Sequence, residues 1–245
     1  MSDSDRTLIR ARIFECIFNT AVNVPESLYA IAQFVSMQDF PSKWPSFLVD
    51  LKSNLDPSSP VSTFRCFKIL DLAFDYIRKC PKSNDSVSIV LELTNTFAEI
   101  LLPMLELSSK ELAISSNVET RLEILSHAFS FYRSIITFDI PQYFVDHSSI
   151  IFNTILFVLK CWNEGSPMIK SNFKLSDKLL SNIFETLNFY ASCYDEDLNL
   201  LPEITQLSLS IVVTNAGSAF ESLPLLLRFL SKKMKKEALG DGFKN

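Results

Sequence analysis

Glycine is the residue type that most constrains this chain, because only 4 of its 245 residues are glycine, whereas average usage would give roughly 17. Sheets, sandwiches and nucleotide-binding βαβ units need glycine at tight turns and phosphate loops, so its scarcity argues against all of these folds. Apolar residues nevertheless make up 47% of the chain. The sequence therefore predicts an all-α protein whose helices bury apolar faces and are joined by short polar connections.

Apolar residues recur at helical spacing along nearly the whole chain, between clusters of Pro, Asn, Ser and Asp. The pattern predicts about ten helices, over residues 5–20, 25–37, 43–54, 62–79, 85–107, 118–138, 142–162, 170–194, 200–214 and 218–236. They pair at a spacing of about 40 residues, which is typical of HEAT-like repeats. We therefore predict a solenoid of antiparallel helix pairs over residues 1–236 and a disordered tail over residues 237–245.

The helix predicted over residues 43–54 illustrates the pattern. Pro41 disfavours a helix at Phe40, and Pro45 suits a first helical turn, so we expect this helix to begin near Lys43. Its apolar stripe consists of Trp44, Phe47, Leu48, Leu51 and Leu55.

Charge and cysteine content narrow the class of partner. The formal net charge is -5. The chain therefore lacks the positive field that attracts the phosphate backbone of nucleic acids. The 5 cysteines are scattered and form no C-x-x-C pair, so we expect reduced thiols in a nuclear or cytosolic protein. The longest nearly uncharged apolar stretch, residues 150–159, is shorter than the roughly 18 residues of a membrane span, so we expect no membrane insertion.

The sequence shows no pattern of a catalytic, cofactor or metal site. The 2 histidines, His127 and His147, lie on separate segments. We expect His127 to be a partly buried packing residue in the middle of the helix over residues 118–138, and His147 to lie at the surface. P-loop, G-x-G-x-x-G and G-x-S-x-G motifs are absent. The acidic run 195–197 is typical of a helix start, and the basic run 232–236 is either a partner-binding or localisation patch or a solvated helix end. We expect neither enzyme activity nor a cofactor.

Residues 37–51 read Met-Gln-Asp-Phe-Pro-Ser-Lys-Trp-Pro-Ser-Phe-Leu-Val-Asp-Leu and follow Ala30-Ile31-Ala32. This stretch resembles a signature near the N-terminus of importin-beta superfamily transport receptors, and it is most similar to that of the CAS-type exportins. Residues 138–146, Phe-Asp-Ile-Pro-Gln-Tyr-Phe-Val-Asp, are similar to a second segment of that family. We expect the signature residues to hold a helix hairpin together; they are Asp39, Phe40, Pro41, Trp44, Pro45, Leu48 and Leu51.

The resemblance implies a nuclear transport receptor that binds the GTP-loaded form of Ran, contributes to the export of importin-alpha, and shuttles between nucleus and cytoplasm. In that family the second helix of each repeat lines the concave side, so the helices over residues 5–20 and 43–54 are expected to be the earliest inner ones. Polar residues on these helices are the predicted Ran-binding residues: Arg6, Arg10, Glu15, Asp50 and Asn54.

Members of the family are several times longer than this chain. The resemblance implies that the chain begins inside the second repeat and ends after roughly the fifth, as a fragment or a truncated product would. The alternative is a helical-repeat scaffold without transport activity, which binds protein partners or itself through exposed end helices. This alternative is motivated by a mean hydropathy of +0.18 and by apolar residues of the first helix that have no preceding partner in the chain, namely Leu8, Ile9, Ile13, Phe14 and Ile17.

Overall fold

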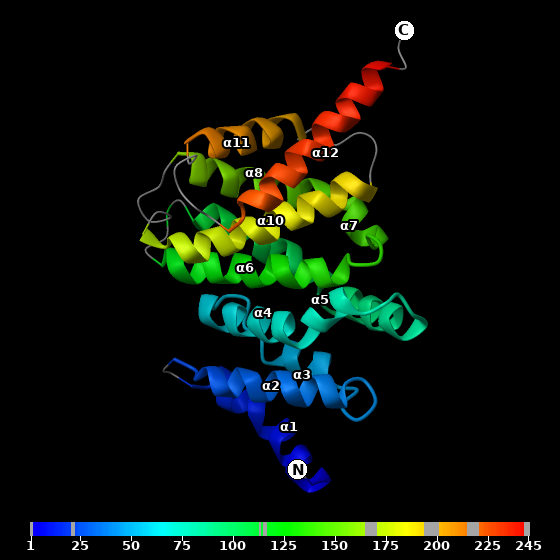
Figure 1. The fold of residues 1–245 in the computed structure, drawn as a ribbon. Helices are drawn as coiled ribbons and strands as arrows, with labels where there is room; N and C mark the ends of the chain where they lie inside the picture. Colours follow the sequence, from blue (N-terminus) through cyan, green and yellow to red (C-terminus); the bar gives the residue numbers. More distant parts are fainter. Residues whose placement is uncertain are drawn as a thin grey trace. The chain divides into compact units, whose positions relative to one another are not determined.

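The computed structural model describes residues 2–20, 23–112, 114, 117–164, 171–193, 201–214 and 221–242. Within these residues the regular secondary structure is entirely helical, as the glycine content predicted. In chain order the helices are α1 (Asp3–Phe18), α2 (Glu26–Asp39), α3 (Phe47–Ser53), α4 (Pro60–Phe74), the 3₁₀ helix η1 (Asp75–Lys79), α5 (Asn84–Glu111), α6 (Val118–Ile135), α7 (Gln142–Asp146), α8 (Ser148–Asn163), α10 (Phe173–Cys193), α11 (Leu201–Thr214) and α12 (Leu223–Gly242) (Figure 1).

The chain divides into two compact units, and the single repeat domain expected over residues 1–236 stays a prediction. The first unit comprises Met1–Met104 and Ser130–His147, and the second comprises Leu105–Phe129 and Ser148–Asn245. The boundary falls inside α5 and inside α6, so each of these helices contributes residues to both units.

The helix that was expected to begin near Lys43 begins at Phe47 instead. A turn over residues 40–46 precedes it, in which the backbone carbonyl of Asp39 accepts hydrogen bonds from the N–H groups of Lys43 at 2.6 Å and Trp44 at 2.8 Å. The Phe40–Pro41 peptide bond is cis, and Pro45 lies in the turn, outside the helix. The prediction of the helix start was wrong because these hydrogen bonds close a turn where the apolar spacing alone suggested a helix.

Further helix boundaries also differ from the predicted ones. The helix expected over residues 62–79 is α4 followed by η1, since Phe74 leaves the helical region with φ -115° and ψ 5°. The helix expected over residues 142–162 is divided into α7 and α8 at His147, whose φ of -111° and ψ of 19° interrupt it. α12 ends at Gly242 and not at residue 236, so the predicted tail over residues 237–245 lies partly in this helix and partly outside the described residues.

Aromatic side chains form the core of the first unit where α4, α5 and α6 meet. The ring of Phe131 on α6 lies 6.4 Å from the ring of Phe67 on α4 and 6.1 Å from that of Phe97 on α5, between centroids. Tyr132 contacts Phe144 of α7 edge-on at 5.0 Å, which anchors the second family-like segment to α6. All five side chains are fully buried.

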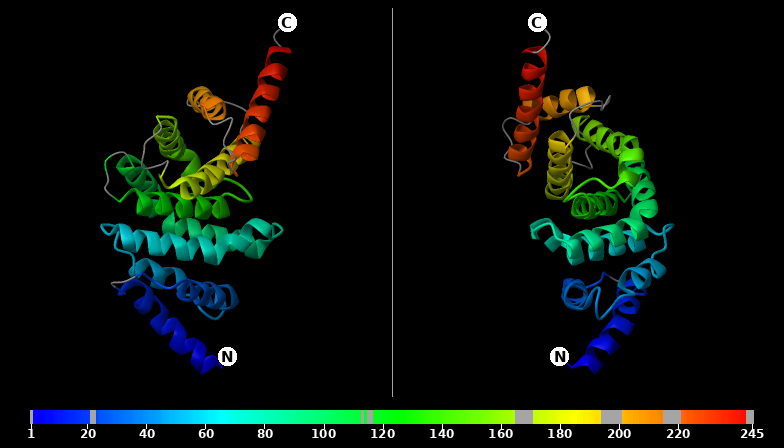
Figure 2. Two further views of the ribbon diagram at one scale, coloured as in Figure 1. Left: turned by 60° about the vertical axis from the view of Figure 1, so that its left-hand side comes forward. Right: turned by 90° about the vertical axis from the view of Figure 1, so that its right-hand side faces the viewer.

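In the second unit α10 packs on α12 and α8 packs on α11 (Figure 2). Buried Asp177 of α10 accepts hydrogen bonds from the backbone N–H groups of Glu221 at 2.6 Å and Ser222 at 3.1 Å, immediately before α12. Lys232, the first residue of the basic run, donates to the carbonyl of Asn188 in the last turns of α10 at 3.0 Å. Lys232 therefore stabilises a helix end, while the side chains of residues 233–236 lie outside the described part of the chain.

Among the described residues, α5 is long and apolar enough to cross a membrane by length and composition alone. The shorter stretch over residues 150–159 lies in α8. In α5, Leu93 and Phe97 are fully buried, while Glu92 and Glu99 are exposed on another side of the helix. A buried apolar face and an exposed acidic face are typical of a helix that packs against a protein core.

Candidate partner-binding residues

The carboxylate of Asp39, the last residue of α2, is fully buried and is bound by two arginines of α1. Arg6 donates from Nη1 to Oδ1 at 2.8 Å, and Arg10 donates to Oδ2 from Nε at 2.9 Å and from Nη2 at 2.6 Å. Arg6 and Arg10 are four residues apart, so they lie on one face of α1. A buried carboxylate depends strongly on such partners, because removing one side of a buried pair leaves a charge without compensation.

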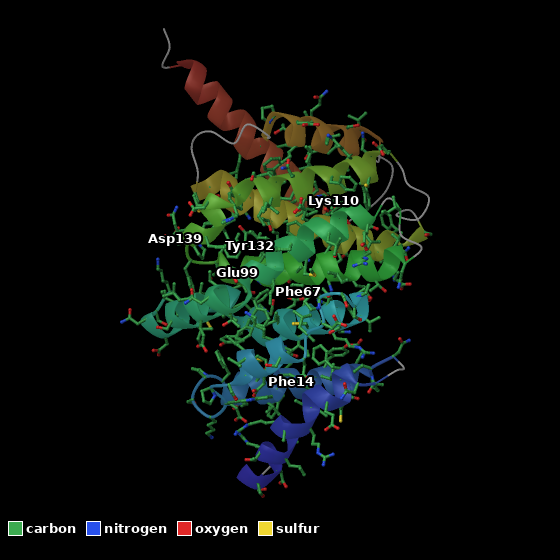
Figure 3. All side chains as sticks on the ribbon, turned by 180° about the vertical axis from the view of Figure 1, so that it is seen from behind. Phe14, Phe67, Glu99, Lys110, Tyr132 and Asp139 are labelled. Atoms are coloured by element: carbon green, nitrogen blue, oxygen red, sulfur yellow. The ribbon has the colours of Figure 1, made fainter. Side chains whose placement is uncertain are left out.

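An aromatic cluster next to this ion pair joins α1, the turn over residues 40–46, α3 and α4. Phe14 stacks on Trp44 with 5.4 Å between ring centroids, and Trp44 contacts Phe47 edge-on at 5.0 Å. Phe40 in turn lies 5.6 Å from Phe74 of α4. Phe14, which Figure 3 labels, and Trp44 are each 4% exposed. The signature aromatics thus hold the N-terminal helices of the first unit together.

Asp50 binds the same tryptophan from α3. Its Oδ2 accepts a hydrogen bond from Trp44 Nε1 at 2.8 Å and another from Ser46 Oγ at 2.7 Å. Asn54 follows the end of α3, and its Nδ2 donates to the backbone carbonyl of Asp50 at 2.8 Å. A buried indole N–H needs such an acceptor, so Asp50 and Asn54 stabilise the turn and the helix that follows it.

The predicted Ran-binding residues are thus not gathered in one exposed surface. Arg6 and Arg10 meet at Asp39, whereas Asp50 and Asn54 lie together at α3. Glu15 is exposed on α1. Among the signature residues, Pro41 and Pro45 are exposed, and the buried ones are Asp39, Phe40, Trp44, Leu48 and Leu51.

Sequence reasoning missed two charged contacts of the first unit. The first is the Asp39 pair, for which the signal was an i, i+4 pair of arginines and an acidic residue beside Phe-Pro. The second joins η1 to α6, because Arg78 Nη1 donates to Ser130 Oγ at 3.0 Å and pairs with Asp75. Burial, together with the charge of Arg78, lowers the pKa of Arg133 to about 10. Nothing local in the sequence marks this second contact, since its partners lie 52 residues apart.

Possible metal ligands do not gather among the described residues: no group of three or more His, Cys, Asp or Glu side chains there could hold a metal ion. His127 is buried in α6, and His147 is exposed with Nδ1 2.8 Å from the carbonyl oxygen of Tyr143. These positions match the packing and surface positions predicted for them. The acidic run 195–197 lies outside the described residues.

The helix-on-helix packing and the buried signature hairpin define the class of this protein as a HEAT-like helical-repeat protein. The family model Cse1 matches residues 74–234, more than half of the chain. The chain therefore belongs to the Cse1 family, a family of importin-beta-type exportins. This match confirms the resemblance seen in the sequence.

Individual relatives agree with this assignment. The chain is 25% identical over 209 residues to Exportin-2 of Dictyostelium discoideum, covering 80% of this chain and 22% of that protein. It is 23% identical over 226 residues to Exportin-2 of Danio rerio, covering 87% of this chain and 23% of that protein. The solved structure of the exportin Cse1 in its cargo-free, cytoplasmic state matches with a TM-score of 0.82 at 17% identity, covering 100% of this chain and 28% of that one. The last match confirms the predicted HEAT-like fold.

Proposed function

We propose that this chain is part of a nuclear export receptor, in which it binds the GTP-loaded form of Ran and contributes to the export of importin-alpha. The observation that carries the proposal is the Cse1 family match over residues 74–234, supported by the similarity to two Exportin-2 proteins. The proposal includes shuttling between nucleus and cytoplasm and the absence of a catalytic activity of its own. Since the chain spans 22% and 23% of these relatives, we propose that it supplies one part of the partner surface.

The contacts divide the candidate Ran-binding residues into two kinds. Glu15 is exposed on α1, so we propose it as a residue that contacts Ran directly. The others make hydrogen bonds within the first unit, and we propose that they position α1 and α3 for binding; these residues are Arg6, Arg10, Asp50 and Asn54.

The test is binding of the purified chain to Ran loaded with a non-hydrolysable GTP analogue, compared with Ran loaded with GDP. We expect selective binding of the GTP form, because nonspecific adhesion does not distinguish the two nucleotides. Glu15→Arg should weaken this binding by about tenfold, as reversal of a charge in an interface does. Glu119→Arg is the matched control, since Glu119 is an exposed glutamate of α6.

Equal failure to bind both nucleotide forms would contradict the Ran part of the proposal and leave the family assignment intact. Equal losses in the Glu15 and Glu119 variants would show that the charge of the whole chain, and not a contact at α1, affects binding. Importin-alpha is then added to the Ran-GTP mixture. Increased retention of importin-alpha by the chain in the presence of Ran-GTP supports the export part of the proposal.

The scaffold alternative is favoured by a different observation, an exposed apolar strip on α2. Ile31, Phe34 and Met37 are 42%, 56% and 43% exposed. The first helix contributes less exposed apolar surface than its sequence suggested, because Ile13, Phe14 and Ile17 are buried within the first unit. If α2 mediates self-association, light scattering at micromolar concentration will show a dimer that Phe34→Ser converts to a monomer. A monomeric wild-type chain would exclude self-association through α2 and would count strongly against this alternative.

A further inference from the structure

Arg65 of α4 is a buried arginine that binds the end of α1. It donates from Nη1 to the backbone carbonyl of Phe18 at 3.1 Å and from Nη2 to that of Thr20 at 2.9 Å. Arg65 is 7% exposed, although an arginine is almost never buried unless its charge has partners. The carbonyls at the C-terminus of a helix lack partners inside the helix and carry partial negative charge. Arg65 therefore caps α1 from a helix that lies 47 residues further along the chain.

Only the C-terminal part of α1 is anchored by apolar packing. None of residues 4–12 is buried, and these turns extend past α2 in Figure 1. The buried side chains of α1 are Ile13, Phe14 and Ile17. Apolar contacts have no preferred direction, so they define the rotation of α1 and its position along its axis only weakly. The donors of a guanidinium form a rigid, planar fork. The arginine contacts, at Asp39 and at the C-terminal end, therefore supply the directional contacts that define where α1 lies.

Glu15 lies in the turn of α1 that Arg65 caps. It precedes Phe18 by three residues, and its own carbonyl accepts a hydrogen bond from the N–H of Asn19 at 3.0 Å. The side chain of Glu15 is exposed, whereas the carbonyls at the end of the same turn are bound by a buried cation. Any displacement of this turn moves the carboxylate of Glu15 with it.

We propose that Arg65 is a positioning residue for partner binding. By binding the carbonyls of Phe18 and Thr20 it holds the last turn of α1 in place, and with it the carboxylate of Glu15. Arg65 is buried and does not itself contact the partner. It acts by restricting the motion of α1 before binding, which lowers the entropy lost when the complex forms. The inference rests on the proposed function, in which Glu15 contacts Ran.

Amide hydrogen exchange of the whole chain, followed by peptide mass spectrometry, tests the position of α1 without any partner. Arg65→Met keeps an apolar stem but removes the donors, so exchange over residues 9–19 should rise by about tenfold. Arg65→Lys keeps the charge and should raise it by about threefold at most. Arg78→Met is the matched control, because Arg78 also donates to a backbone carbonyl, that of Ser130 in α6, at 2.5 Å; it should leave exchange in α1 unchanged. Equal exchange of α1 in the wild type and in Arg65→Met would overturn the proposal.

A double-mutant cycle measures whether Arg65 acts through Glu15. Arg65→Met should weaken binding of Ran loaded with the GTP analogue by about tenfold. In the Arg65→Met background, Glu15→Arg should then weaken binding by less than about threefold, because the carboxylate is no longer held in place. A tenfold effect of Glu15→Arg in both backgrounds would overturn the positioning role, since a general loss of stability leaves the two effects additive.

The two measurements separate failure of this inference from failure of the proposed function. If the wild-type chain binds neither form of Ran, the proposed contact of Glu15 is wrong, and the role of Arg65 in partner binding is wrong with it. Hydrogen exchange still decides in that case whether Arg65 holds α1 in place. If Ran-GTP binds and exchange in α1 rises in Arg65→Met without any loss of affinity, Arg65 only stabilises the helix, and the proposed function stands without it.

Discussion

Arg10 of α1 donates two hydrogen bonds to a single oxygen of Asp39, at 2.6 Å and 2.9 Å, across 29 residues of chain. Arg6 binds the other oxygen. The carboxylate is fully buried, while the arginine side chains are about one fifth exposed, at 19% and 21%. The ion pair therefore fixes α1 against the end of α2, where the signature turn begins.

Asp39→Asn should destabilise the first unit by about 3 kcal/mol, because it leaves two partly buried guanidinium groups without their counter-charge. The free energy of unfolding in urea measures this change. Glu26→Gln is the control, since Glu26 also pairs with a cation, Lys68, but is 80% exposed, and its replacement should cost less than about 1 kcal/mol. Similar losses in both variants would contradict a special role of the buried pair.

Asp50→Leu should destabilise the chain by about 1–3 kcal/mol, because it removes the acceptor of the buried Trp44 indole N–H. Asp50→Asn retains an acceptor oxygen and should cost less than half as much. Urea unfolding followed by Trp44 fluorescence, in a Trp162→Phe background, measures both values. If the two variants lose the same stability, the charge of Asp50 matters and the hydrogen bond to Trp44 does not.

The charge of Asp75 makes the stability of the protein vary with pH in the acid range. Burial alone would raise its pKa, but the hydrogen bonds and charges of Lys79 and Arg78 hold the pKa of Asp75 below its ordinary value. A lowered pKa means that the contribution is present above the unfolded value of about 4 and is lost as the pH falls through the folded value. We therefore expect Asp75→Asn to lower stability at pH 7 by less than about 1 kcal/mol, and we expect this difference to shrink as the pH falls through the folded pKa of Asp75.

Urea titrations of this variant and the wild type at several pH values give the comparison. A constant difference between the two proteins from pH 7 to pH 2 would show that Asp75 contributes through packing and not through its charge. Glu15→Gln, at an exposed site of α1, provides the baseline for replacing a surface carboxylate.

The cysteines should differ in reactivity according to their burial. Burial raises the pKa of the Cys66 thiol, and burial together with the charge of Glu164 raises the pKa of Cys161. Cys16 and Cys193 are exposed. Iodoacetamide at pH 8 should therefore modify the two exposed thiols first and the two buried ones only in denaturant, which peptide mass spectrometry can resolve. Modification of native Cys66 at the rate of Cys16 would contradict the burial of α4 in the core.

How well each feature could be predicted from the sequence depends on which interactions decide it and on how far apart in the chain the interacting residues lie. The apolar spacing correctly indicated that Phe47, Leu48 and Leu51 are buried, because side chains three and four residues apart share a helix face. Trp44 is buried too but lies in the turn before α3, and Leu55, the last residue of the predicted stripe, follows α3 and is only half-buried. It failed at Lys43, where two backbone hydrogen bonds to Asp39 close a turn, and at His147, where the helix is interrupted. Apolar spacing does not distinguish a non-helical turn from the first turn of an α-helix when both bury the same side chains.

Helical periodicity and glycine scarcity are local properties, so the sequence was enough to predict the helical fold that the described residues show. It also determined the family, since the signature is one continuous stretch. The roles of the polar residues, by contrast, follow from how the helices pack. Arg6, Arg10 and Asp50 look like surface residues in the sequence, and they became partners of buried groups because packing of α1, α2 and α3 desolvates Asp39 and Trp44. A desolvated polar group requires a partner wherever in the chain that partner lies, and for this reason spacing along the sequence did not reveal it.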